Sequence, residues 1–250
     1  MPLAFRVIAR LDVKGPNVIK GVQMEGLRVL GKPSDFARRY AEQGADELLY
    51  LDTVASLYAR SNLTEIIEEA ADGVFVPITV GGGVRTVDDV RRLLVAGADK
   101  VALNTAAIAD PALVRRAADR VGSQAIVVSI EAKRTGTATW EAFTDQGRQR
   151  TGRDALEWAE EAARLGAGEI LLTSIDRDGT QKGPECELAG AIRARVACPV
   201  VLCGGIASAE HAVSAAQSAD AIVLGAGLHY GRTSIPAIKT ALASAGQVVR

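Results

Sequence analysis

Short apolar runs alternate with amphipathic stretches along the whole chain. Eight runs are rich in Val, Ile and Leu, at residues 5–12, 47–52, 76–80, 100–104, 125–131, 169–174, 199–203 and 221–225. Runs that stay apolar at nearly every position are typical of strands in a parallel sheet covered on both faces. Between them lie stretches with apolar residues at helical spacing, several of which end at glycine, such as 35–45, 86–98 and 154–167. The pattern therefore predicts a series of β/α units.

Eight β/α units in 250 residues favour an α/β fold of the (β/α)8 TIM-barrel type. The chain also repeats itself by halves, since LDVK at 11–14 corresponds to IEAK at 130–133. We therefore expect a single domain over residues 1–250, built from two half-barrels at about 1–120 and 121–250. A doubly wound sheet is the alternative fold, but it gives no reason for this duplication.

Composition narrows the class of protein. Net charge is −1 with both signs interspersed, which argues against nucleic acid or an anionic membrane as the partner. No apolar run reaches the roughly 18 residues of a membrane span, and the N-terminus does not fit a secretion signal. The three cysteines, Cys186, Cys198 and Cys203, lack the spacing of metal ligands. We expect a cytoplasmic protein without metal or cofactor.

Two carboxylates end corresponding strands of the two halves. Asp12 closes the first predicted strand and Glu131 the fifth, and these strands lie opposite each other in a ring of eight. The carboxyl ends of barrel strands carry the active site, so the two acids are expected to face each other across its mouth. Such a pair can supply a general acid and a general base. The alternative is that the acids only form salt bridges with the nearby Lys14 and Lys133.

Glycines and small polar residues follow four of the strands. Glycine lets the backbone approach an anion closely, and N–H groups at a helix start can bind a phosphate. The candidates are Gly82, Gly83, Asn104 and Thr105 in the first half, and Gly204, Gly205, Gly225 and Ala226 in the second. One site in each half predicts a long ligand with two phosphates. The alternative is that the glycines only serve turns.

The stretches LDVK, VGGGV, GADKVALNTAA and SIDRDGT extend through both halves of the chain. In these stretches the chain resembles the cyclase subunit of imidazole glycerol phosphate synthase, the HisF family of histidine biosynthesis. The sibling isomerase of the same pathway shares the half-barrel but fits SIDRDGT less well.

The resemblance implies an ammonia-dependent lyase and cyclase reaction. Ammonia condenses with a phosphoribulosyl aminoimidazole-carboxamide ribonucleotide, a C–N bond breaks, and imidazole glycerol phosphate and the aminoimidazole carboxamide ribonucleotide are formed. Asp12 matches the family's first catalytic Asp, and Glu131 falls where the family has its second. Lys20 matches a substrate-binding lysine, and the resemblance adds Asp178 and Gly179 of SIDRDGT to the substrate-binding residues.

The ammonia must come from elsewhere, because the chain shows no cysteine–histidine–acid arrangement of a glutaminase. We therefore expect a separate glutamine amidotransferase subunit at the N-terminal face of the barrel. Four charged residues begin predicted strands and match the family's charged gate for ammonia: Arg6, Glu47, Lys100 and Glu169. The alternative is a purely structural ring of salt bridges.

Four features depart from the family. Glu131 replaces an Asp, which moves the carboxylate by about 1.5 Å, and misplacements of this size can cost about 10²-fold in rate. Arg10 stands where the family often has a small residue and could pair with a carboxylate or a substrate anion. KGPN at 14–17 replaces a Lys/Arg-Asp-Gly turn, and Gly225-Ala226 replaces Ala-Ser.

These departures gather near the mouth, where the acceptor of ammonia binds. They fit a HisF-like paralogue that uses ammonia to amidinate a surface-polysaccharide sugar, so this function stays open beside the histidine-pathway cyclase. An isomerase, or a subunit that only binds and routes ammonia, also stays open.

Overall fold

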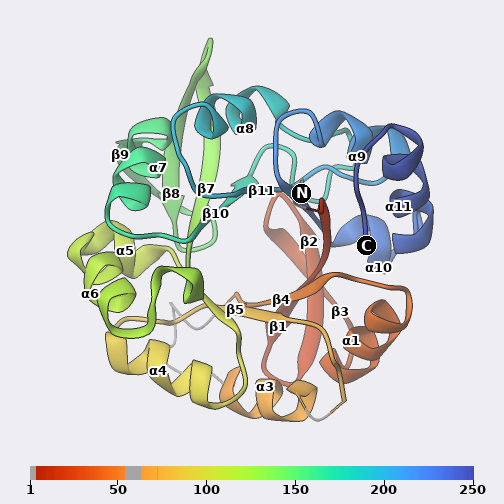
Figure 1. Ribbon diagram of the computed structural model, residues 1–250, viewed down its shortest axis with the longest axis horizontal. Helices are drawn as coiled ribbons and strands as arrows, with labels where there is room; N and C mark the ends of the chain where they lie inside the picture. The colour runs from red at the N-terminus through yellow and green to blue at the C-terminus, as the bar shows by residue number, and fades with distance from the viewer. Residues whose placement is uncertain (1–3, 54–62, 72) are drawn as a thin grey trace.

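The computed structural model describes residues 4–53, 63–71 and 73–250. In this part of the chain, parallel strands pair into a closed ring, seen end-on in Figure 1. The ring consists of β1 (Arg6–Lys14), β4 (Glu47–Asp52), β5 (Ile78–Gly81), β6 (Lys100–Leu103), β7 (Ile126–Gly136), β10 (Glu169–Ser174), β11 (Val200–Cys203) and β12 (Ala221–Leu224). β1 pairs with β4 and β12, and β7 pairs with β6 and β10, which closes the ring. The (β/α)8 barrel is confirmed, and the doubly wound sheet is excluded.

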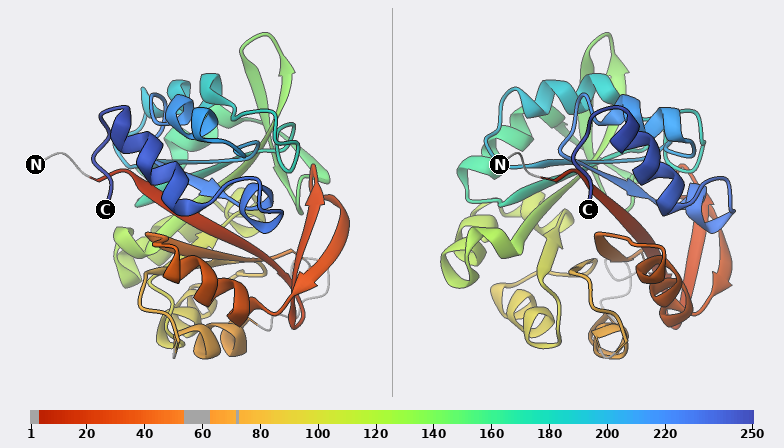
Figure 2. Two further views of the ribbon diagram at one scale, coloured as in Figure 1. Left: turned by 90° about the vertical axis from the view of Figure 1, so that its right-hand side faces the viewer. Right: turned by 45° about the vertical axis from the view of Figure 1, so that its right-hand side comes forward.

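Helices surround the ring on its outside (Figures 1 and 2). They are α1 (Pro33–Glu42), α3 (Leu63–Ala71), α4 (Val87–Val95), α5 (Thr105–Ala109), α6 (Ala112–Val121), α7 (Ala155–Arg164), α8 (Cys186–Arg193), α9 (Ala209–Ala215), α10 (Ala226–His229) and α11 (Ile235–Ser244), with the short 3-10 helix η1 (Ser123–Ala125) before β7. Thr86, Asp154 and Ser208 begin helices by accepting backbone N–H groups, as N-cap residues do. Within the described residues, no helix has the length and hydropathy needed to cross a bilayer.

Side chains on the strands alternate between the barrel interior and the helices. On β1, Val7 and Ala9 belong to the large apolar core under the helices, while Ile8 belongs to a second apolar cluster inside the ring. This inner cluster takes residues from the middle of the strands: Ile8, Leu49, Leu51, Ala102, Val127, Leu171, Val201, Cys203, Ala221 and Val223. Charged residues lie at the two ends of the interior, so the strands are apolar on both faces only in their middle part.

Two β-hairpins extend the sheet beyond the ring. β2 (Asn17–Val22) and β3 (Glu25–Gly31) follow β1, whereas β8 (Thr139–Thr144) and β9 (Gln149–Asp154) follow β7. The sequence pattern did not predict them. β3 is largely exposed, so no apolar face marks it as a strand. Both hairpins stand at the end of the barrel away from the chain termini, where they frame its mouth (Figure 2).

Candidate functional site

A cavity of about 370 Å³ at the mouth, which we call the main cavity, lies over the ends of β5, β6 and β7. The structure brings together here the predicted residues of the first half with one of the two acids: Gly82, Gly83, Asn104, Thr105 and Glu131. This volume falls within the range of small-molecule sites. The cavity is therefore the candidate ligand site of the protein.

The loop after β5 needs glycine for its shape. Gly82 and Gly83 have φ values of 110° and 70°, and a Cβ on Gly82 would lie 2.3 Å from the Asp52 carbonyl oxygen. After β6, the side-chain oxygen of Asn104 is buried and has no hydrogen-bond partner among the described residues. Buried polar atoms are normally paired, so this oxygen is available to accept a hydrogen bond from a ligand. We call Gly82, Gly83, Asn104 and Thr105 the first anion site.

The corresponding residues of the second half adopt the same backbone. Gly204 and Gly205 have φ values of 108° and 81°, and Gly225 has φ −122° and ψ −88°, against −130° and −90° at Asn104. We call Gly204, Gly205, Gly225 and Ala226 the second anion site. Their shared cavity measures only about 20 Å³, room for roughly one water by a measure in which a water needs about 10–15 Å³.

Two buried cations lie beside the second anion site. Arg10 and Lys20 line its cavity together with Asp178 and Gly179, and both cations are 3% exposed or less. Nε of Arg10 donates to Asp12 at 2.7 Å, while Nζ of Lys20 donates to Asp12 and to Asp178, each at 3.0 Å. These four charged side chains form a buried ionic cluster in which two cations face two carboxylates. Lys20 lies on β2, so the unpredicted hairpin supplies one member.

The ionic cluster keeps Asp12 in its ionised form. Burial alone would raise the pKa of Asp12, but the Arg10 guanidinium and the Lys20 ammonium outweigh burial and hold this pKa well below its usual range. Asp12 is therefore a carboxylate at any working pH. Lys14, the partner considered from the sequence, is exposed and makes no salt bridge with Asp12. The pairing of Arg10 with a carboxylate is confirmed.

Glu131 lies in a different environment, across the ring from Asp12. It is 4% exposed and accepts the Gly147 N–H at 2.9 Å, and within the described chain it forms no salt bridge. Burial raises the pKa of Glu131 to about 7, although the Arg10 charge and the Gly147 N–H oppose the rise. Lys133 is exposed and forms no salt bridge with Glu131, so the alternative of simple salt bridges to Lys14 and Lys133 is excluded. Near neutral pH, Glu131 can hold or release a proton.

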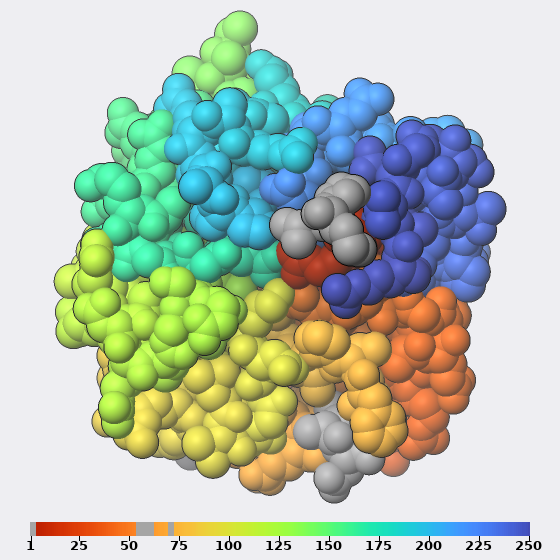
Figure 3. Space-filling model, in the orientation of Figure 1, coloured from red at the N-terminus to blue at the C-terminus, as the bar shows by residue number. Residues whose placement is uncertain are grey.

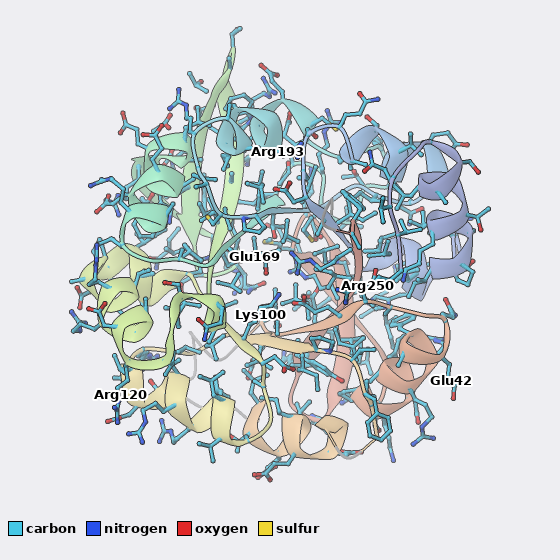
Figure 4. The ribbon with its side chains drawn as sticks, in the orientation of Figure 1. Glu42, Lys100, Arg120, Glu169, Arg193 and Arg250 are labelled. Carbon is cyan, nitrogen blue, oxygen red and sulfur yellow. The ribbon has the colours of Figure 1, made fainter. Side chains whose placement is uncertain are left out.

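The four charged residues predicted at the strand starts meet at the opposite end of the barrel. Arg6 bonds to Glu47 at 2.9 Å and to Glu169, and Lys100 bonds to the same carboxylates at 2.8 and 2.9 Å. The ring alternates in sign, and the Thr79 hydroxyl also donates to Glu47. Figure 4 shows Lys100 and Glu169 close to the barrel axis. We call these four residues the floor ring.

Sequence reasoning missed several residues of the main cavity. Ser129 lines it from β7, two positions before Glu131, and strand periodicity could have identified it. Asp145 and Gln146 come from the turn between β8 and β9, and no sequence signal pointed to them. In the described part of the chain, no cluster of three His, Cys, Asp or Glu side chains is arranged to hold a metal ion.

The fold and the cavity define a (β/α)8-barrel protein with its ligand site at the C-terminal mouth. Residues 6–234 match the protein family described as "Histidine biosynthesis protein". A relative from Legionella pneumophila, imidazole glycerol phosphate synthase subunit HisF, is 57% identical over 205 residues, which cover 82% of this chain and 97% of the relative. The chain therefore belongs to the HisF family of histidine biosynthesis proteins.

The raised pKa of Glu131 predicts a pH dependence of stability. Between pH 4.5 and about 7 the folded protein keeps a proton on Glu131 that the unfolded chain has lost. The free energy of unfolding should therefore fall as the pH rises through this window, by about 3 kcal/mol from this group. Glu131→Gln removes this contribution. Urea unfolding of both proteins from pH 4.5 to 8 should show the variant gaining about 3 kcal/mol relative to wild type. If the free energies of unfolding of the two proteins changed with pH in the same way, the raised pKa of Glu131 would be contradicted.

Proposed function

We propose that the protein is the cyclase subunit of an imidazole glycerol phosphate synthase. It uses ammonia to convert the phosphoribulosyl aminoimidazole-carboxamide ribonucleotide to imidazole glycerol phosphate and the aminoimidazole carboxamide ribonucleotide. The observation that carries the proposal is the unequal pair Asp12 and Glu131, set on opposed strands of a HisF-family barrel. The reaction needs no metal or cofactor, and the cytoplasm is the proposed location.

The two acids take different roles in the reaction because their environments differ. Environments that push two pKa values apart assign acid and base roles. Glu131 exchanges protons near neutral pH and acts as the general acid when ammonia condenses and the C–N bond breaks. Asp12 keeps its negative charge and stabilises positive charge that develops on the attacking nitrogen. Asp12 becomes a stronger base when contact with Arg10 or Lys20 loosens.

The first anion site binds one phosphate of the substrate. Backbone N–H groups at Gly82 and Gly83, the Asn104 amide and the Thr105 hydroxyl border the same cavity as Glu131. The phosphate therefore positions the reacting part of the substrate beside the acid. Gly204, Gly205, Gly225 and Ala226 receive the second phosphate, which requires Arg10 and Lys20 to move apart.

A glutaminase subunit docks at the face where the strands begin, which Figure 3 shows. A depression of about 660 Å³ lies on this face and includes Arg6, Lys100 and Glu169 of the floor ring as well as Arg193 and Arg250. Above the ring, the interior of the barrel is apolar, which suits passage of neutral ammonia and disfavours ammonium. The floor ring therefore acts as the charged gate between the partner and the mouth.

Turnover with ammonium and the ribulosyl substrate tests the proposed reaction. Asp12→Asn should reduce turnover to background and keep substrate binding, because the charge is lost while the shape stays. Glu131→Asp restores the acid found in the family and should keep or raise the rate. Steady-state kinetics and calorimetric binding provide the measurements. A drop of more than about tenfold in Glu131→Asp would show a cavity built around Glu and would favour another acceptor.

The floor ring predicts a specific defect in ammonia transfer. Lys100→Ala removes one of the two cations of the floor ring, so Glu47 and Glu169 share Arg6 alone. One carboxylate charge is then uncompensated, which disturbs the arrangement of the ring. Turnover with saturating ammonium should stay near the wild-type rate, whereas the ratio of glutamate released to product formed should rise when glutamine is the source. The measurement uses the chain paired with its glutaminase. An unchanged ratio in a folded variant would reduce the ring to a structural role.

The small second anion site favours a second candidate function. The family often has a small residue at the position of Arg10, whose side chain here lines the small cavity of the second anion site and is held by Asp12. A ligand that reaches only the first anion site would be smaller than the bisphosphate. Amidination of a surface-polysaccharide sugar with ammonia from the same kind of partner fits such a ligand.

Anion binding distinguishes the two candidate functions. A crystal structure determined in phosphate should contain two anions for the cyclase, one near Gly83 and Asn104 and the other near Gly205 and Ala226. Arg10 should then have moved away from Asp12. A single anion at the first site, with Arg10 still on Asp12, would support the sugar acceptor. Anions at neither site would contradict both assignments of the cavity.

A further inference from the structure

The turn between β8 and β9 has an uncommon backbone. Asp145, Gln146 and Gly147 have φ values of 51°, 60° and 72°, three successive residues in the left-handed region. The Arg148 N–H closes the turn by donating to the Thr144 carbonyl oxygen at 3.1 Å. Non-glycine residues adopt this conformation at a cost, and such residues cluster at functional sites when their surroundings hold them in place. We call Asp145–Gly147 the mouth turn.

Two hydrogen bonds join the mouth turn to the two parts of the main cavity. At one end, the Asp145 N–H donates to the Thr105 hydroxyl oxygen at 3.3 Å. At the other end, the Gly147 N–H donates to the Glu131 carboxylate at 2.9 Å. The mouth turn therefore contacts the first anion site and the candidate acid directly, although it lies on a hairpin outside the ring.

Packing keeps the mouth turn in this position. A Cβ on Gly147 would lie 3.0 Å from a methyl carbon of Ile175 and 3.3 Å from the sulfur of Met24, so the turn is close to both side chains. Ile175 and Met24 form a small buried cluster with Phe143 of β8. Gln146 lines both the main cavity and the small cavity beside Asp12. The mouth turn thus borders the cavities of both carboxylates.

We propose that the mouth turn is a positioning element for Glu131, and that Thr105 links its position to the occupancy of the first anion site. Thr105 contacts the anion, whereas Asp145–Gly147 act through Glu131. The link requires an anion in the first site and rests to that extent on the proposed function, but it holds for either acceptor of ammonia.

A hydroxyl can make both contacts at once. Thr105 has one O–H donor and two acceptor lone pairs, so it can donate to an anion while it accepts the Asp145 N–H. Hydrogen bonds in such a chain strengthen one another. An anion in the first site should therefore order the mouth turn and shorten the time that the Gly147 N–H spends away from Glu131. The acid is then held in place when substrate is bound.

Other charged groups also act on Glu131. Those that border its cavity or influence its charge are Arg10, Asp12, Asp52, Arg85, Asp110, Asp145 and Asp178, and Lys20 and Arg148 line the neighbouring small cavity. A substitution at Thr105 replaces none of these groups, and of them Asp145, which lies in the mouth turn, is bonded to Thr105. A shift in the pH profile of a Thr105 variant would therefore report the mouth turn and its hydrogen bond to Glu131.

The kinetic test compares three variants. Thr105→Val removes the hydroxyl and keeps the shape, so kcat should fall and its pH profile should move to higher pH by about one pH unit, because the Gly147 N–H opposes the rise of the Glu131 pKa. Thr105→Ser keeps a hydroxyl and should restore both. Asn104→Ala loses a contact to the anion but none to the mouth turn, so KM should rise while the pH profile of kcat stays unchanged. A Thr105→Val variant that changes KM alone would overturn the proposal.

Amide hydrogen exchange gives a readout that needs no turnover. Inorganic phosphate should slow exchange of the Gly147 N–H by about fivefold or more in wild type and in Thr105→Ser, and should leave it unchanged in Thr105→Val. Shifts of the Gly83 and Asn104 amide signals report whether phosphate occupies the first anion site. Occupancy without slower exchange at Gly147 in wild type would overturn the coupling and leave the anion site intact. No occupancy would overturn both.

Discussion

The closed ring of parallel strands fixes the direction of every side chain that it carries. Successive side chains on a strand point to opposite faces, so Arg6, Ile8 and Arg10 of β1 enter the interior at three successive heights. They contribute in turn to the floor ring, the apolar layer and the ionic cluster at the mouth. A shift of one residue in the pairing of β1 would turn all three side chains outward. The floor ring and the ionic cluster at the mouth therefore both depend on the register of this strand.

Burial and charge act differently on the two acids at the mouth. Asp12 forms ion pairs with Arg10 and Lys20, and a buried carboxylate with such partners stays ionised. Glu131 has a backbone N–H as its partner, so desolvation prevails and raises its pKa. The repeated half-barrels thus place equivalent acids in unequal surroundings. The same imbalance leaves an open cavity in the first half and a nearly filled one in the second.

Much of the barrel could be predicted because its strands are buried on both faces. The apolar runs located the ring strands to within a few residues, and the charges that interrupt them at Arg6, Glu47, Lys100 and Glu169 located the floor ring. The hairpins could not be found in this way. β3 and β9 stand outside the barrel, bury no continuous apolar face and carry polar residues at most positions. Asp145 and Gln146 of the second hairpin were therefore missed as well, whereas Lys20 of the first was found through the family resemblance.

The sequence by itself determined the ring of strands, the opposed placement of Asp12 and Glu131 and the glycine-rich turns at the mouth, because strand periodicity and the half-chain repeat can be read directly from the order of the residues. Only the tertiary structure decided which acid keeps its charge and which anion site is open. Lys20 reaches Asp178 across 158 positions of the chain. Such contacts depend on how the β2–β3 hairpin and the loop after β10 fold over the mouth. The electrostatic effect of a charge there depends on its burial, and no local pattern of residues specifies this burial.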